Sequence, residues 1–125
     1  MKIQRFEDIE AWKKTRELTK SIYRVSSKDK FSKDWTLRDQ IRRAAISIMS
    51  NIAEGFDSGF SAEFARFLNI SRRSASEVQS QLYIALDQMY ISIEEFNALY
   101  GDTEEIRKMI TGFVKYLKSY KSETR

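Results

Sequence analysis

Two arginine pairs are the residues of this chain whose types and spacing suggest chemistry most directly. Arg42-Arg43 and Arg72-Arg73 each place two guanidinium groups next to one another. A guanidinium group can hold two phosphate oxygens through parallel hydrogen bonds. Adjacent residues of a helix point to different faces, so both members of a pair are not easily buried. The pairs therefore predict a positive surface for phosphate, although surface arginines also pair with nearby acids at little energetic gain.

A basic stripe adds to this surface in the segment from Asp8 to Ser26. At about 100° per residue, four basic side chains gather roughly opposite the apolar positions of this segment. They are Lys13, Arg16, Lys20 and Arg24. The chain has 22 basic and 18 acidic residues, and residues 1–30 contribute the whole excess of +4. This balance favours an anionic partner such as nucleic acid, but a solvated helix face without a partner fits it equally well.

Carboxylates are the remaining candidates for catalysis. An acid and base pair among Glu54, Glu63 and Glu77 would require burial that separates their pKa values. A hydrolase that used Glu54 or Glu77 would also need those carboxylates to converge in a pocket. The chain has no histidine and no cysteine, which removes imidazole bases, thiolate nucleophiles and the usual zinc and di-iron ligand sets. The sequence therefore predicts a protein that is not an enzyme, with no catalytic residue, no cofactor and no metal.

Long helices must position these side chains, because the chain is poor in the residues that form turns. The 125 residues include no proline and only four glycines, and turns consume both. Apolar residues recur at steps of three and four, which predicts one all-α domain over residues 1–125. We expect an antiparallel up-down-up-down four-helix bundle with helices over about 8–26, 35–54, 61–89 and 94–120.

Small polar residues and glycine mark the expected helix ends. We expect Asp8 to cap the first helix, Gly55 to end the second, and Ser58 or Ser61 to cap the third. Ser92 and Glu95 have the spacing of a capping box for the fourth helix. That helix should continue through Gly101, because the phase of its apolar residues survives there.

Sixteen aromatic residues are more than the core of one slim bundle holds. Six of them do not all fit its four core faces: Phe56, Phe60, Phe67, Tyr83, Tyr90 and Tyr100. Surplus apolar groups of this size predict a partner surface, most simply for a second copy of the chain.

The ends of the chain carry no targeting signal. No stretch approaches the roughly 18 consecutive apolar residues of a membrane span. We therefore expect a cytoplasmic protein with no membrane partner.

Four stretches of the chain carry a resemblance to a known family. They are Phe6-Glu-Asp-Ile-Glu-Ala-Trp12, Gln40-Ile-Arg-Arg-Ala-Ala-Ile-Ser-Ile48, Asn51-Ile-Ala-Glu-Gly55 and Ser61-Ala-Glu-Phe-Ala-Arg-Phe-Leu68. With them the chain resembles the bacterial four-helix bundle proteins encoded in intervening sequences of 23S rRNA genes. The same family includes the accessory variability determinant proteins of diversity-generating retroelements. The resemblance covers nearly the whole chain.

The resemblance implies a small bundle that assembles into a homopentamer and binds RNA or DNA through a positive surface. It also implies a reverse transcriptase as partner for the retroelement members. Asn51, Glu54 and Gly55 are implied to build the turn between the second and third helices. The chain departs from the family pattern at Met49, where many relatives have proline, and at Arg73, where glycine is frequent.

The leading prediction is a non-enzymatic, homo-oligomeric bundle that binds nucleic acid electrostatically and with little dependence on base sequence. The predicted phosphate contacts are Lys13, Lys20, Arg24, Arg42, Arg43, Arg73 and Lys115. The alternative is a protein-interaction scaffold whose basic residues only solvate the surface or cross subunit interfaces. In that case Arg43→Glu should disrupt assembly and not RNA binding.

Overall fold

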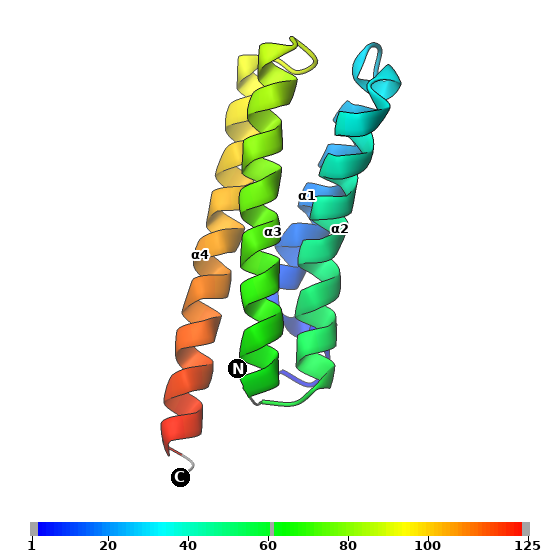
Figure 1. Ribbon diagram of the computed structural model, residues 1–125. Helices are drawn as coiled ribbons and strands as arrows, with labels where there is room; N and C mark the ends of the chain where they lie inside the picture. The colour runs from blue at the N-terminus through cyan, green and yellow to red at the C-terminus, as the bar shows by residue number, and fades with distance from the viewer. Residues whose placement is uncertain (1–2, 61, 124–125) are drawn as a thin grey trace.

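Four antiparallel helices make up the described part of the chain in the computed structural model (Figure 1). The structure describes residues 3–60 and 62–123, with side chains as far as residue 119. The helices are α1 (Glu10–Ser26), α2 (Trp35–Asp57), α3 (Ala62–Asp87) and α4 (Ile93–Glu123), with short 3₁₀ turns at Phe6–Asp8 and Phe31–Lys33. No strand occurs in the described ranges. The predicted all-α up-down-up-down bundle is confirmed.

Each helix packs against two neighbours. Helices α1 and α3 both contact α2 and α4. The α1–α2 and α3–α4 connections lie at one end of the bundle, and the α2–α3 connection lies at the other end with both termini (Figure 1). Because α1 and α2 are direct neighbours, the end of α1 comes to lie beside Arg42 of α2.

The core contains most of the apolar positions that the three-and-four spacing marks, but Met89, which the spacing also marks, is exposed. Each helix contributes side chains that are 0–1% exposed, among them Leu18, Ile48, Leu82 and Ile106. Burial of one such side chain contributes about 1.5–3 kcal/mol. This burial holds one face of every helix inward and so leaves the opposite face of α1, with its basic residues, in solvent.

The first helix begins later than predicted. Asp8 lies in the 3₁₀ turn before it, where Oδ2 accepts hydrogen bonds from the backbone amides of Gln4 and Arg5 at 3.1 and 3.2 Å. Helix α1 starts at Glu10. The cause is Ile9, whose extended backbone (φ −77°, ψ 121°) separates turn and helix while its side chain enters the core.

The second helix runs past Gly55 to Asp57, so the prediction that Gly55 ends it is wrong. Gly55 is buried within α2. A Cβ atom there would lie 2.7 Å from Cδ1 of Phe64 and 2.9 Å from Cβ of Phe67. Glycine is therefore required because α3 approaches closely, and not because the chain turns.

Ser58 caps the end of α2 and not the start of α3. Its amide donates to the carbonyl of Glu54, and its Oγ donates to the carbonyl of Gly55 at 2.6 Å. Gly59 follows with a φ of 85°, which glycine adopts without strain. Ser61, the other expected cap, lies outside the described residues.

The third helix ends at Asp87, two residues before the predicted limit at Met89. The amide of Tyr90 donates to the carbonyl of Ala85, and the amide of Met89 donates to that of Leu86, both at 2.9 Å. This pair of bonds is the Schellman pattern of helix ends. Met89 takes the position where glycine is usual, with a φ of 60° and an exposed fraction of 87%.

The fourth helix begins with the predicted capping box. Oγ of Ser92 accepts from the amide of Glu95 at 3.0 Å, and Oε1 of Glu95 accepts from the amide of Ser92 at 2.9 Å. The helix continues through Gly101 without interruption, as expected. Within the described residues, no helix has the length and apolarity that crossing a membrane requires.

Candidate nucleic-acid interface

The basic stripe of α1 faces solvent. Lys13, Arg16, Lys20 and Arg24 are exposed, whereas Leu18 on the opposite face is buried. Two of the four have weak partners on the same helix: Nζ of Lys13 lies 3.1 Å from Glu10, and Nζ of Lys20 lies 3.8 Å from Glu17. Exposed pairs of this kind contribute at most about 1 kcal/mol, so these cations stay available to an external anion.

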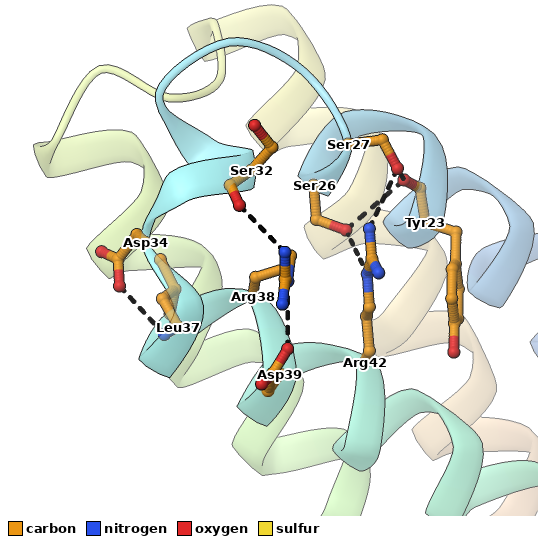
Figure 2. A network of polar contacts seen from close by, with 9 residues as sticks. All are labelled: Tyr23, Ser26, Ser27, Ser32, Asp34, Leu37, Arg38, Asp39 and Arg42. Atoms are coloured by element: carbon orange, nitrogen blue, oxygen red, sulfur yellow. Dashed lines mark hydrogen bonds and ion pairs between the residues drawn. The ribbon is translucent and has the colours of Figure 1, made fainter.

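The arginine pair of α2 divides between two roles. Arg42 is half-buried at the end of α1, where Nε donates to Oγ of Ser26 at 2.8 Å and Nη2 donates to Oγ of Ser27 at 2.9 Å (Figure 2). Its guanidinium carbon also lies 4.5 Å from the centroid of the Tyr23 ring. Arg43, the next residue, is exposed. Arg42 therefore joins α1 to α2, and Arg43 faces solvent.

The arginine pair of α3 divides in the same way. Nη2 of Arg72 donates to Oδ1 of Asn69 at 2.7 Å, and Nη1 donates to Oγ1 of Thr111 on α4 at 3.2 Å. Arg73 is exposed. Within the described residues, neither Arg43 nor Arg73 belongs to an ion pair. The 100° step between neighbours explains why one member of each pair packs inward and the other does not.

A shallow groove of about 560 Å³ lies along α1 where it borders α2. Its lining is mostly apolar and includes Thr19, Tyr23 and Met49, and Oγ1 of Thr19 donates to Sδ of Met49 at 3.4 Å. Three residues of the basic stripe also line the groove: Arg16, Lys20 and Arg24. The groove thus combines an apolar surface with three cationic side chains.

A second hollow of about 370 Å³ also has Tyr23 in its lining. Its lining consists of Tyr23, Asp39, Arg42, Arg43 and Ile46. Tyr23 is thus common to both hollows. We call the exposed basic residues Arg16, Lys20, Arg24 and Arg43, together with Tyr23 and Met49, the α1–α2 basic face.

The structure brings four of the predicted phosphate contacts to these two hollows. They are Lys20 and Arg24 in the first and Arg42 and Arg43 in the second. Lys13 belongs to the same stripe of α1 but lines neither hollow. The hydrogen bonds of Arg42 to Ser26 and Ser27 leave it with less capacity for an external phosphate than Arg43.

The other two predicted contacts lie elsewhere. Arg73 is exposed on α3, and Lys115 is exposed on α4. Lys115 lines a different hollow of about 290 Å³, which it shares with Arg107 and Lys108. A common site for all seven predicted residues is therefore absent from the described hollows.

Sequence reasoning missed Tyr23 and Met49 as parts of this face. One signal for Tyr23 was its position between Lys20 and Arg24 in the stripe, since an aromatic residue among basic ones is typical of nucleic-acid surfaces. A signal for Met49 was its departure from the proline that is common in the resembling family. Neither signal shows that the two residues line one groove, because they belong to different helices.

Asn51 supports the contact between helices α2 and α3, and not the turn that joins them. Its Nδ2 donates to the carbonyl and to Oγ of Ser47, at 2.8 and 3.1 Å. Oγ of Ser47 lies 2.8 Å from Oγ of Ser74 on α3. Glu54 acts at the helix end through its carbonyl, which accepts from the amide of Ser58, while its side chain is exposed.

Among the candidate catalytic carboxylates, Glu63 has a partner on its own helix. Glu63 accepts two hydrogen bonds from Arg66, at 2.7 and 3.1 Å, and these hold the pKa of Glu63 below its usual range. Glu77 lies on the same helix 14 residues later, about 21 Å along the axis. Glu63 and Glu77 therefore cannot act as a pair. No group of three or more acidic residues able to hold a metal ion occurs among the described residues.

Comparison with known proteins finds a matching family and a similar solved structure. Residues 7–112 match the family model of the 23S rRNA-intervening sequence protein. A crystal structure of a protein of unknown function from the S23 ribosomal protein family of Bacteroides thetaiotaomicron is similar, with a TM-score of 0.76 and 27% identity over 84% of this chain and 98% of that one. The curated proteins include no match. Since the matched residues span most of its length, the chain belongs to the family of 23S rRNA-intervening sequence proteins.

Proposed function

We propose that this chain is a non-enzymatic, homo-oligomeric bundle that binds RNA or DNA through the α1–α2 basic face. The observation that carries the proposal is the set of exposed cations around Tyr23. Arg16, Arg24 and Arg43 belong to no ion pair within the described residues, and Lys20 has only the loose contact with Glu17. Cations arranged in this way meet phosphates without breaking a stable internal bond.

The names of the relatives support nucleic acid as the partner class. The family is named for 23S rRNA, and the solved relative is assigned to a ribosomal protein family although its function is unknown. Repetition of the face in a homo-oligomer, a pentamer by the resemblance of the sequence, would multiply its charge. Several weak copies then bind one polymer more tightly than a single copy does.

The test is a salt titration of binding by two sets of charge-reversal variants. One carries Lys20→Glu, Arg24→Glu and Arg43→Glu, on the α1–α2 basic face. The other carries Arg73→Glu, Lys115→Glu and Lys118→Glu, which change the net charge equally on exposed positions of α3 and α4. Fluorescence anisotropy with labelled RNA and DNA gives the affinity at each salt concentration.

We expect the unmodified protein to bind with an affinity that falls steeply with salt. The first variant should lose most of this affinity, and the slope against log salt should decrease by about two to three. The second should bind nearly as the unmodified protein does. Absence of binding at about 50 mM salt, or equal weakening in both variants, would overturn the proposal.

A protein-interaction scaffold is the second candidate function. The observation that favours it is a group of exposed apolar residues near the two connections at one end of the bundle: Trp35, Met89 and Ile93, at 70%, 87% and 52%. Light scattering on the unmodified protein and on Trp35→Gln with Ile93→Gln gives the oligomeric state. An assembly that the double variant loses, together with no affinity for nucleic acid, would favour the scaffold.

A further inference from the structure

The groove of the α1–α2 basic face contains an aromatic side chain that charge attraction alone does not require. We propose that this groove binds single-stranded nucleic acid, with an unpaired base stacked on Tyr23 and the flanking phosphates on Lys20 and Arg24. The inference rests on the proposed function. It adds the class of nucleic acid and the residue that contacts the base.

Arg42 covers one face of the Tyr23 ring. Its guanidinium carbon lies 4.5 Å from the ring centroid, and Arg42 is itself fixed by hydrogen bonds to Ser26 and Ser27 (Figure 2). Arg42 lines the second hollow but not the groove. Tyr23 lines the groove where Arg42 does not, and the residue is 40% exposed, so part of its surface is open to a ligand there. An aromatic surface that is already fixed loses little conformational freedom when a ligand stacks on it.

The lining of the groove suits a base better than it suits phosphate alone. A phosphate site needs donors, whereas the surface here is mostly apolar and its lining includes Tyr23, Met49 and Thr19. Thioethers make favourable contacts with aromatic systems. Lys20 and Arg24, which also line the groove, supply the hydrogen-bond donors. A ligand that joins a flat apolar ring to a nearby negative charge matches both parts, and a nucleotide within a strand is such a ligand.

Stacking on Tyr23 requires an unpaired base. In a duplex both faces of each base already contact neighbouring bases, so a side chain reaches only the groove edges and the phosphates. A single strand exposes its base faces, and stacking accepts any base because each has a π-face. Stacking also does not read the 2′-hydroxyl group, so single-stranded DNA and RNA should bind alike.

The test compares oligo-deoxythymidine, oligo-uridine and a DNA duplex of the same length, each with a fluorescent label. Tyr23→Leu keeps an apolar side chain but removes the aromatic ring, and Tyr23→Phe restores the ring without the hydroxyl. Tyr83→Leu is the matched control, because Tyr83 is an exposed tyrosine on α3, away from the groove. Anisotropy at constant salt gives each affinity.

We expect Tyr23→Leu to weaken binding of both single strands roughly tenfold and to leave duplex binding unchanged. Tyr23→Phe and Tyr83→Leu should bind as the unmodified protein does. Salt-dependent binding that Tyr23→Leu does not weaken would overturn this inference while leaving the proposed function intact. A change of oligomeric state on Tyr23→Leu without nucleic acid would also overturn it, because a second copy would then occupy the groove. Absence of all nucleic-acid binding would overturn the proposed function first.

Photo-crosslinking supplies a measurement that does not depend on how the variants fold. A strand containing 4-thiouridine, bound to the unmodified protein and irradiated, should attach to peptides that contain Tyr23 or Met49. Attachment confined to the peptides of α3 and α4 would place the base elsewhere and overturn the inference.

Discussion

Gly55 shows how the absence of one methyl group lets two helices approach. Its nearest contact would be Phe64, which is fully buried and has little room to move. We expect Gly55→Ala to lower the free energy of unfolding by about 1–3 kcal/mol, the usual cost of overpacking a core. Urea denaturation followed by circular dichroism measures this difference.

Gly112 is the matched control for Gly55. It also lies within a helix, but it is exposed and a Cβ atom there meets no other atom within 4 Å. Gly112→Ala should raise the free energy of unfolding by up to about 1 kcal/mol, because alanine favours helix more than glycine does. Equal destabilisation by the two substitutions would contradict the role assigned to Gly55.

Arg42 and Arg43 provide a second contrast between neighbouring residues. Arg42→Met removes two hydrogen bonds to the end of α1, so we expect it to lower the free energy of unfolding by about 1–2 kcal/mol. Arg43→Met affects only an exposed side chain and should change stability by less than about 0.5 kcal/mol. Thermal denaturation of both variants checks this. A larger effect at Arg43 would contradict the division of roles within the pair.

The limits of sequence reasoning at this scale are visible in Gly55. Glycine after a run of helical residues is typical of a helix end, and the local pattern contains nothing against that interpretation. Phe64 on the next helix explains the glycine, because its ring occupies the space that a side chain at position 55 would need. The spacing of residues within one helix gives no information about a contact with another helix.

At the scale of the helix, the end of α3 stores a small strain. Met89 adopts a left-handed backbone conformation that costs a non-glycine residue about 1–2 kcal/mol. Its side chain is 87% exposed, so little burial is lost on its removal. We expect Met89→Gly to raise the free energy of unfolding by about 1 kcal/mol, and Met89→Val to lower it because a β-branched residue tolerates this conformation least. Denaturation in urea measures both, and destabilisation by Met89→Gly would contradict the account.

Glu104 connects α3 and α4 in a way that depends on pH. Its Oε1 accepts hydrogen bonds from Nε2 of Gln79 and Nη1 of Arg107, both at 3.0 Å. These bonds hold the pKa of Glu104 below its usual value of 4.5. A carboxyl group whose pKa is lower in the folded state stabilises the fold above the unfolded pKa, and this contribution is lost as pH falls through the folded pKa.

Glu104→Gln should therefore differ from the unmodified protein most at neutral pH. We expect the difference in the free energy of unfolding to shrink as pH falls below about 4.5. Urea denaturation in a pH series measures it. Gln79→Leu should reduce the same pH dependence, because Gln79 is the largest cause of the lowered pKa. A difference that stays constant down to acid pH would contradict this assignment.

Helices were the most predictable elements, because their signals are local. The capping box at Ser92 and the continuity of α4 through Gly101 follow from residues within a few positions of one another. The start of α1 was less predictable, since Asp8 had the right type for a cap. Burial of Ile9 in the core decided where that helix begins, and burial depends on the other helices.

The bundle itself was predictable from the sequence, and the candidate site only in part. Periodicity gave the outward direction of the stripe on α1, and the order of the helices places α2 beside it. The groove also depends on Tyr23 of α1 and Met49 of α2 lying at the same level along the bundle. That level is set by the packing of the two helices, which the spacing within each helix does not contain.

The order of contacts around the bundle has a kinetic consequence. Apart from α1 with α4, the helix pairs in contact are consecutive in the chain. Bundles with mostly local contacts refold within microseconds to milliseconds, and the α1–α4 contact has the highest entropic cost because it closes the longest loop. We therefore expect the α2–α3 pair to form early and α1 to dock on α4 late.

Stopped-flow refolding tests this order. Ser71→Ala removes the hydrogen bond from Oγ to the carbonyl of Ile48, at 2.9 Å between α3 and α2, and should mainly slow refolding. Met109→Ala, in the hollow between α4 and the start of α1, should mainly speed unfolding. The opposite pattern would reverse the order. The junction of the first and last helices is thus the expected place where the native bundle opens first, and amide protons there should exchange with solvent sooner than those between α2 and α3.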